Sequence, residues 1–238
     1  MSKPVDRAPR IGESPGHVLA DDVDHVIWDW NGTLLDDHEH TVRVTNTMLR
    51  AEGLPETDPA RARVLFDFPA KRYYERLGFE LSPGRWEKIA TLFIETYDAG
   101  VGDCTLHVHA REVLAILQAR GRNSSILSAA RKSSIEPLLE KHGIGRFFND
   151  VVGLDDHYAH GKVELGIEWL ERRAIPKERA LLIGDTVHDF EVARAMGVRC
   201  VLFAGGHHAR ERLEQCGCPI VDRLDELVDI SAEAKGRV

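Results

Sequence analysis

The sequence predicts an α/β protein, with a doubly wound parallel sheet in a Rossmann-like core and a helical cap inserted into it. From residue 109 onward, short apolar runs alternate with amphipathic stretches of about ten to fifteen residues. This is the order of strands and helices in a parallel sheet covered by helices. Between residues 55 and 103 the patterns are helical and no convincing strand is found, which predicts the insertion.

The first elements follow from composition and periodicity. Residues 1–22 combine Pro, Gly, Ser and mixed charges without an apolar stretch, so we expect a flexible arm. The run HVIW at residues 25–28 is apolar and largely β-favouring, which predicts a buried strand. A helix is expected next, because Val42 and Leu49 recur on one face and Gly53 ends the pattern. Short helices continue in DPARARVLF, PAKRYYERLGF and SPGRWEKIATLFIETYDAG.

The second part of the chain predicts regular alternation. The expected elements are helix 109–120, strand 123–128, helix SSIEPLLEKHG, strand 148–154, helix VELGIEWLERR, strand 179–185, helix HDFEVARAMG, strand RCVLFAGG, a helical ERLEQCG, a short PIVD strand and a final helix DELVDI. We therefore divide the chain into an N-terminal arm over 1–22, an α/β core over 23–37 and 109–238, and an α-helical cap over 38–108.

Composition excludes several classes of function. The 238 residues are 43% hydrophobic and 29% charged, which suffices for a full core. A net charge of −8 and the lack of a basic stripe argue against nucleic acid as a partner. No segment offers the ~18 uninterrupted apolar residues of a membrane helix, and no signal peptide precedes the core. We expect a cytoplasmic protein without a membrane partner; the sequence does not indicate its oligomeric state.

Polar residues follow several of the predicted strands. Asp29 ends the first strand, Ser128 ends the strand at 123–128, and Asp185 ends the strand at 179–185; Lys162 and Asp189 begin later helices. Each alone is better explained as a helix cap, a turn residue or a solvated charge. Together they indicate a site, because the carboxyl ends of parallel strands lie along one edge of the sheet.

The chemistry of these residues fits phosphoryl transfer. Mg²⁺ prefers hard oxygen ligands, which Asp29, the backbone carbonyl of Asn31 and Asp185 can supply, with Asp189 holding a water or a neighbouring ligand. Lys162 can then face a phosphate oxygen while a hydroxyl donates to the same group. Ser128 supplies this hydroxyl. Gly32 and Thr33 let the loop backbone approach the phosphate.

These residues resemble the motifs of the haloacid dehalogenase-like (HAD) hydrolase superfamily. DWNGTLLDD resembles its first motif, ILS ending at Ser128 its second, Lys162 its third and LLIGDTVHDFEVARAMGV its fourth. The helical insertion resembles members with an α-helical cap of the phosphoglycolate-phosphatase-like kind. The resemblance implies a Mg²⁺-dependent phosphatase that acts on a small phosphorylated metabolite through an aspartyl-phosphate on Asp29. It also implies phosphate contacts from Gly32, Thr33, Ser128, Ala129 and Lys162.

Asn31 departs from the family pattern. Phosphatases of this family typically carry Asp there, which protonates the leaving alcohol and then activates water. An amide cannot exchange a proton at neutral pH, so general acid–base catalysis, typically worth ~10²–10⁴-fold, should be reduced. Three interpretations stay open: a phosphatase with another proton donor, a phosphotransferase or slow hydrolase, or a non-catalytic phosphate-binding member of the fold.

Histidines are the candidates for a substitute proton donor, because their protons move near neutral pH. The pair that follows the strand RCVLF is placed best, since it lies at a strand end beside the expected crevice. The candidates are His38, His40, His107, His109, His157, His160 and the pair His207 and His208.

Overall fold

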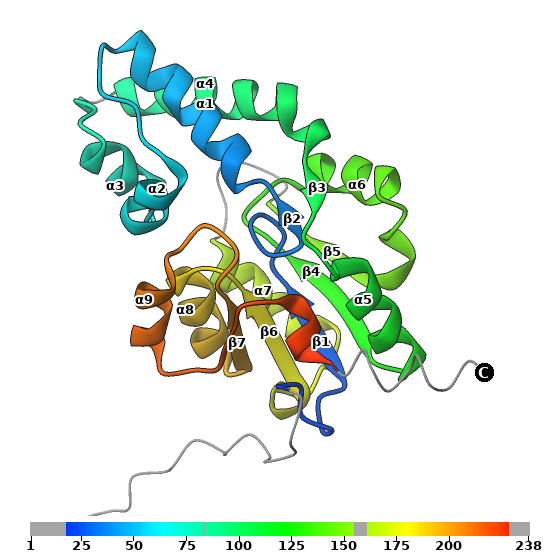
Figure 1. Cartoon of the computed structure of the whole chain (residues 1–238). Coiled ribbons are helices and arrows are strands. Elements are labelled where there is room, and N and C mark those ends of the chain that lie inside the picture. Colours follow the sequence, from blue (N-terminus) through cyan, green and yellow to red (C-terminus); the bar gives the residue numbers. More distant parts are fainter. Residues whose placement is uncertain (1–17, 83, 155–160, 229–238) are drawn as a thin grey trace, which may run out of the picture.

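The computed structural model describes residues 18–82, 84–154 and 161–228, and it contains a six-stranded parallel sheet (Figure 1). The strand order is β5-β4-β1-β6-β7-β8, with β1 in the interior of the sheet. The strands are β1 (His25–Trp28), β4 (Asn123–Leu127), β5 (Asp150–Val152), β6 (Ala180–Gly184), β7 (Arg199–Phe203) and β8 (Ile220–Val221). The predicted doubly wound α/β fold class is confirmed.

The pairing register of β1 explains why the strand ends meet. Trp28, the last residue of β1, lies level with Ile126 of β4 and Ile183 of β6. All three strands are parallel, so Asp29 and the loops that follow β4 and β6 leave the sheet at the same carboxyl edge.

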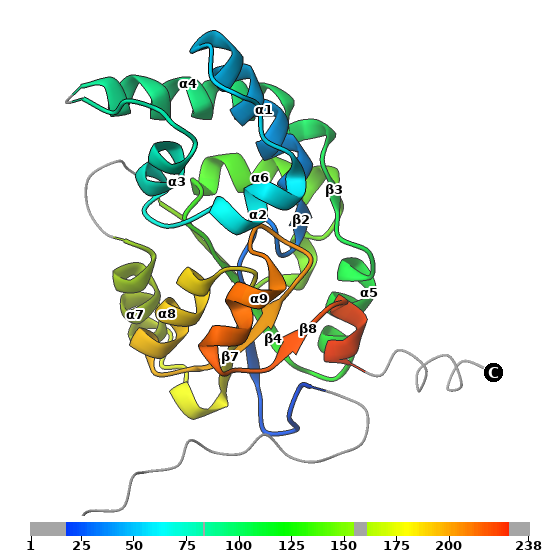
Figure 2. The same ribbon diagram turned by 60° about the vertical axis from the view of Figure 1, so that its left-hand side comes forward.

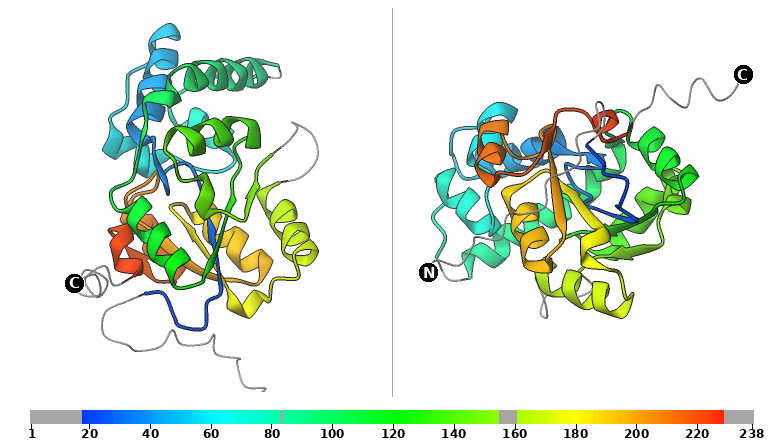
Figure 3. Two further views of the ribbon diagram at one scale, coloured as in Figure 1. Left: turned by 90° about the vertical axis from the view of Figure 1, so that its right-hand side faces the viewer. Right: turned by 90° about the horizontal axis from the view of Figure 1, so that it is seen from below.

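Helices cover both faces of the sheet (Figure 3). Val26 and Trp28 face one apolar cluster with helices α5 (Ala110–Ala119) and α6 (Lys132–Lys141). Ile27 faces the opposite cluster, which includes helices α7 (Lys162–Arg172), α8 (Val187–Met196) and α9 (Arg210–Leu213). Because side chains alternate along a strand, the continuous apolar run HVIW buries both of its faces.

Four further helices form a separate layer beyond the carboxyl edge, here called the helical unit (Figures 1 and 2). They are α1 (His38–Ala51), α2 (Pro59–Leu65), α3 (Ala70–Arg76) and α4 (Arg85–Gly100). Their own apolar cluster contains Leu49 of α1 and Tyr74 of α3. A two-stranded antiparallel ribbon, β2 (Leu35–Asp36) with β3 (Thr105–Leu106), lies between this unit and the core. The sequence did not predict the ribbon, because two residues are too few to show alternation.

Some boundaries differ from the sequence predictions. The expected final helix DELVDI is a 3-10 turn, η5 (Leu224–Leu227), and residues 229–238 lie outside the described part. The expected strand 148–154 is shorter, at Asp150–Val152. The remaining 3-10 turns are η1 (Val101–Asp103), η2 (Gly145–Phe147), η3 (Lys177–Arg179) and η4 (Glu214–Cys216).

The expected N-terminal arm is described only from residue 18. Residues 1–17 lie outside the described part, whereas Leu19 is buried in the core and its backbone N–H donates to the carbonyl of Leu227 over 3.3 Å. Among the helices of the described ranges, none is long and apolar enough to cross a membrane.

Candidate active site

Three carboxylates meet at the carboxyl edge and form what is here called the acidic cluster: Asp29, Asp185 and Asp189. Their ligand oxygens all lie within 4.8 Å of one another, and each residue is buried. Lys162, the first residue of α7, places its Nζ 2.5 Å from Oδ1 of Asp29 and 2.6 Å from Oδ1 of Asp189. Four of the residues singled out in the sequence therefore lie together, although more than 150 residues separate the first from the last.

The electrostatics of the acidic cluster reflect three buried carboxyl groups around one buried lysine. Burial raises the pKa of Asp29 to about 8, with Asp189 and Asp185 adding to the shift and Lys162 opposing it. Burial also raises the pKa of Asp185 to about 6. Burial alone would lower the pKa of Lys162, but Asp189 and Asp29 raise it above its usual value. Lys162 is therefore a permanent cation, and the cluster carries an excess of negative charge that favours a further cation.

The loop after β1 packs directly against the acidic cluster. The Thr33 hydroxyl donates to Oδ1 of Asp185 over 2.7 Å. Gly32 has a φ of +76°, and a Cβ there would overlap with the Asp185 carboxylate and the His207 ring. Only glycine fits this backbone conformation and this close approach, so the loop is shaped to lie against Asp185.

Hydrogen bonds near the N-termini of α6 and α8 hold the side chains of Ser128 and Asp189. Ser128 is buried, and its Oγ accepts from the backbone N–H of Ala130 over 3.1 Å. Oδ2 of Asp189 accepts from the Thr186 hydroxyl over 2.6 Å in a capping box at the start of α8. Ala129 lines the cavity between the helical unit and the core. Ser128, Ala129, Asp29 and Asp189 thus line one cavity, whereas Asp185 is fully buried.

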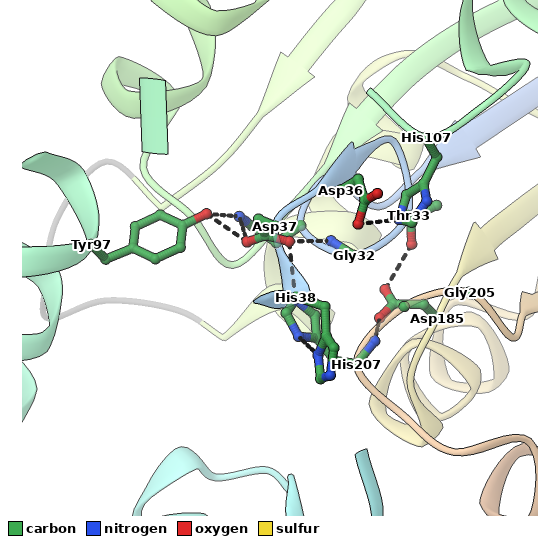
Figure 4. A network of polar contacts seen from close by, with 12 residues as sticks. Gly32, Thr33, Asp36, Asp37, His38, Tyr97, His107, Asp185, Gly205 and His207 are labelled. Atoms are coloured by element: carbon green, nitrogen blue, oxygen red, sulfur yellow. Dashed lines mark hydrogen bonds and ion pairs between the residues drawn. The ribbon is translucent and has the colours of Figure 1, made fainter. Parts of the chain in front are cut away.

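The Asn31 side chain is fixed by a network that the sequence did not reveal. Figure 4 shows its other members, Asp37, Tyr97 and His207. Its Nδ2 donates to Oδ2 of Asp37 over 2.9 Å and to the hydroxyl of Tyr97 over 2.7 Å. The Tyr97 hydroxyl donates to the same Oδ2 over 2.5 Å, and Oδ1 of Asp37 accepts from the backbone N–H of Gly32. Both amide hydrogens of Asn31 are therefore used within the network, and the anionic Asp37 sets the orientation of the amide.

His207 completes this network from the other side. Its Nε2 donates to Oδ1 of Asp37 over 3.2 Å, and its Nδ1 lies 3.3 Å from Nδ1 of His38. Nε2 of His38 must donate to the carbonyl of Pro59, so Nδ1 of His38 is an acceptor. His207 hence carries a proton on each nitrogen. Burial opposes this charge, but Asp37 raises the pKa of His207 to about 9, and both ring nitrogens are already engaged.

The remaining candidate histidines lie in other surroundings. Nδ1 of His208 accepts from the backbone N–H of Val187, and burial lowers the pKa of His208 to about 3. Nε2 of His40 pairs with the backbone carbonyl of Tyr97. Nε2 of His107 lies 3.8 Å from Oδ1 of Asp36, and Nε2 of His109 lies 3.8 Å from Oδ2 of Asp225. His157 and His160 lie outside the described residues. Of the candidates in the described ranges, His207 has the closest tie to Asn31, through Asp37.

Asp37 and Tyr97 were missed by the sequence interpretation. Asp37 stands at the N-cap position of α1, where an acid is usually a cap, yet its carboxylate turns back to the Gly32 loop and makes no capping hydrogen bond. Tyr97 lies near the end of α4, 66 residues from Asn31. A polar residue directly before a predicted helix had an adequate local explanation, and nothing local marks Tyr97.

A cavity of about 700 Å³ opens above these groups, between the helical unit and the core. Asp29, Lys162 and Ser128 line it on the core side. Trp30, which follows the candidate nucleophile, is 1% exposed and belongs to the apolar core cluster, so its main role is packing.

Comparison with known proteins gives the family. Residues 26–203 match the model of the family described as haloacid dehalogenase-like hydrolase. The chain belongs to the haloacid dehalogenase-like hydrolases. The match spans the four motifs noted in the sequence, so the family and enzyme class predicted from them are confirmed.

Several members of the family resemble this chain over most of its length. It is 25% identical over 222 residues to a phosphoglycolate phosphatase of Pseudomonas savastanoi, covering 87% of this chain and 81% of the relative. It is 26% identical to a protein of Dickeya dadantii described as probable phosphatase IndB, covering 85% and 91%. The crystal structure of CbbY from Rhodobacter sphaeroides in complex with phosphate superposes with a TM-score of 0.66 at 20% identity, covering 86% of this chain and 99% of that one.

Proposed function

We propose that this chain is a Mg²⁺-dependent phosphatase that hydrolyses a small phosphorylated metabolite through an aspartyl-phosphate on Asp29. The observation that carries the proposal is the acidic cluster with Lys162 at its centre, buried at adjoining strand ends. The names of the relatives, phosphatases among them, support the same reaction. We further propose that residues 38–108 act as a cap over this site.

The acidic cluster fits a magnesium ion. Oxygen ligands lie about 2 Å from Mg²⁺, so opposite ligands are about 4 Å apart, and the cluster oxygens lie within 4.8 Å of one another. Asp29, Asp185, Asp189 and the backbone carbonyl of Asn31 would hold the ion. When bound, it would neutralise negative charge on the phosphoryl oxygens.

Each residue of the site has its own role in this reaction. A carboxylate oxygen of Asp29 attacks phosphorus, an O–P bond forms, and the ester O–P bond breaks as the leaving oxygen departs. Water then attacks the aspartyl-phosphate, releases phosphate and restores Asp29. Lys162 and the Ser128 hydroxyl face the phosphoryl oxygens, and Gly32, Thr33 and Ala129 supply the close backbone approach.

Asn31 stands, in this proposal, where related phosphatases carry an acid–base Asp. The alternative function follows from it: a phosphotransferase, or a slow or non-catalytic phosphate-binding protein. Lys162 and the three carboxylates of the acidic cluster favour an enzyme over a binding protein, because burying three acids together is costly without a reaction to serve.

Turnover of an aryl phosphate with and without Mg²⁺ tests the proposal. We expect release of phosphate that requires Mg²⁺ and that Asp185→Asn reduces strongly, with a rise in the Mg²⁺ concentration needed for half-maximal rate. Equal rates in Mg²⁺ and in excess chelator would contradict the metal assignment. The absence of phosphate release under every condition would favour the binding protein.

A further inference from the structure

The cavity above the acidic cluster is walled by aromatic side chains. Half of the chain's Phe, Tyr and Trp residues line it. Phe93 and Tyr97 of α4 stack with ring centroids 5.7 Å apart, and Phe68 stacks on His188 with centroids 4.7 Å apart. Such surfaces bind flat apolar groups, because rings bury a large area and stack on one another.

The charges in the cavity are unevenly placed. On the core side, cations and acids line it together: Lys162, His207, Arg131, Asp29, Asp37 and Asp189. Among the described residues of the helical unit that line it, Asp98 is the only charged one. This wall offers no cation to the carboxylate of a small acidic substrate such as phosphoglycolate, and Asp98 would repel it. A cavity of about 700 Å³ is also far larger than such a molecule needs.

Among the residues that the structure describes, neither Asn31 nor His207 directs a free proton at a leaving group. Both amide hydrogens of Asn31 donate to Asp37 and Tyr97, and both ring nitrogens of His207 are paired. An amide has no proton to give. A departing alkoxide, with a conjugate-acid pKa near that of water at about 15.7, needs such a proton. A phenoxide, with a conjugate-acid pKa of about 10 like that of tyrosine, can depart without it.

These two independent observations, the aromatic wall and the engaged amide, point to the same substrate. Building on the proposed function, we propose that the substrate is the phosphate monoester of a phenol-type hydroxyl on a flat, uncharged ring system. The aryl group stacks between the rings of α4 and the Phe68–His188 pair. Its O–P bond breaks as the Asp29 O–P bond forms, and the aryl oxide takes its proton from water after departure.

A panel of four substrates separates leaving group from shape: 2-naphthyl phosphate, phenyl phosphate, benzyl phosphate and phosphoglycolate, each with Mg²⁺. The quantity is kcat/KM, because it reports the steps up to cleavage of the ester bond. We expect phenyl phosphate to exceed benzyl phosphate by about 10²-fold or more, the usual worth of a general acid. We expect 2-naphthyl phosphate to exceed phenyl phosphate and phosphoglycolate to be the poorest.

Two variants of α4 test the binding surface. Phe93→Ala removes a ring of the wall, and we expect a rise of about tenfold in KM for 2-naphthyl phosphate with unchanged inhibition by inorganic phosphate. Leu92→Ala is the matched control, since Leu92 is 48% exposed on the same helix and does not line the cavity. It should leave both constants unchanged.

The outcomes distinguish this inference from the proposed function. Benzyl phosphate or phosphoglycolate within tenfold of phenyl phosphate would overturn the aryl substrate and leave a phosphatase in place. An unchanged KM in Phe93→Ala would overturn the stacking wall. The absence of turnover of all four substrates, with Mg²⁺ present, would overturn the proposed function itself and this inference with it.

Discussion

Asp24 and Asp29 stand at the two ends of strand β1, and their surroundings are opposite. Asp24 lies at the amino end, half-exposed and paired with Arg179 over 2.6 Å, and this hydrogen bond lowers its pKa. Asp29 lies at the carboxyl end, 8% exposed, where burial raises its pKa to about 8. Asp22 repeats the first pattern in its ion pair with Arg199 at 2.7 Å.

The comparison shows that position along the strand, rather than residue type, decides what an aspartate does. At the amino end, solvent and an arginine satisfy each carboxylate, and such surface pairs contribute little to stability. At the carboxyl end, acids are buried together around a single lysine, which disfavours the folded state and favours binding of a cation and a phosphate. Substitutions at the two ends of β1 and in the network around Asn31 test this contrast.

Removing the carboxylate of Asp29 or of Asp24, at the two ends of β1, should have different consequences. Asp29→Asn should lower phosphatase turnover by a factor on the order of 10⁴ or more, because the nucleophile is lost. The same change should raise the stability of the Mg²⁺-free protein, because burial raises the pKa of this acid and so opposes folding, whereas an amide does not titrate. Asp24→Asn should leave turnover unchanged. Phosphate release and urea unfolding measure the two quantities.

A loss of turnover in Asp24→Asn comparable to that in Asp29→Asn would show that general destabilisation, and not loss of the nucleophile, explains the effect. A less stable Asp29→Asn protein would contradict the view that the acidic cluster opposes folding.

His25, the first residue of β1, should make stability depend on pH. Its Nε2 pairs with the Ser125 hydroxyl, and burial lowers the pKa of His25 from 6.5 to about 4. Below pH 6.5 the unfolded chain binds a proton at His25 that the folded chain does not bind. The free energy of unfolding is therefore highest above pH 6.5 and falls as the pH drops toward 4. The loss amounts to about 3 kcal/mol.

Urea unfolding at pH 7 and pH 4.5 checks this value, with His25→Gln as the control. Gln can still bond to Ser125 but does not titrate, so its stability should fall by about 2–3 kcal/mol less than that of the wild type. Equal losses in the two proteins would show that His25 is not held neutral by the fold.

Exchanging the groups at positions 31 and 37 should move the carboxylate into the acid–base position. Asn31→Asp alone places two carboxylates about 2.9 Å apart, so we expect little gain or a loss in turnover. Asn31→Asp combined with Asp37→Asn mirrors the hydrogen bonds and frees the charge. The double variant should hydrolyse benzyl phosphate about 10²-fold faster than the wild type. A large gain from the single change would show that Asp37 does not constrain this position.

Tyr97 should contribute a smaller amount through its contact between α4 and the β1 loop. Tyr97→Phe leaves the buried Oδ2 of Asp37 with one donor fewer, which should cost about 1–2 kcal/mol in urea unfolding. The effect should shrink when Asp37→Ala is also present, because the Tyr97 hydroxyl then has no carboxylate to donate to. Additive losses would indicate that Tyr97 stabilises the protein by other contacts.

Most of the core could be predicted from the sequence because its signals are local. The apolar run before Asp29 and the regular alternation after residue 109 predict the parallel sheet, and parallel strands bring Ser128 and Asp185 to the edge that holds Asp29. The acids and Lys162 could be listed for the same reason. The predicted limits of the cap at residues 38 and 108, and the roles assigned to these residues, stay predictions.

The network around Asn31 could not be predicted, because its members are joined only by the tertiary fold. Asp37, Tyr97 and His207 come from the start of α1, the end of α4 and the loop after β7, and none has a local pattern of its own. The sequence interpretation chose the pair His207 and His208 for its place at a strand end. It could not show that an aspartate would engage His207, or that aromatic residues of α3, of α4 and of the segment between α2 and α3 would gather into one wall.

Trapping of the phosphoenzyme tests the central claim most directly. The wild type, incubated with Mg²⁺ and a labelled aryl phosphate and quenched during turnover, should carry one phosphoryl group on Asp29. Its level should exceed that in the Asn31→Asp/Asp37→Asn protein, because Asn31 cannot activate the water that removes the group. Asp29→Asn should carry none. Turnover of the aryl phosphate without label on Asp29, or label on another residue, would contradict the account.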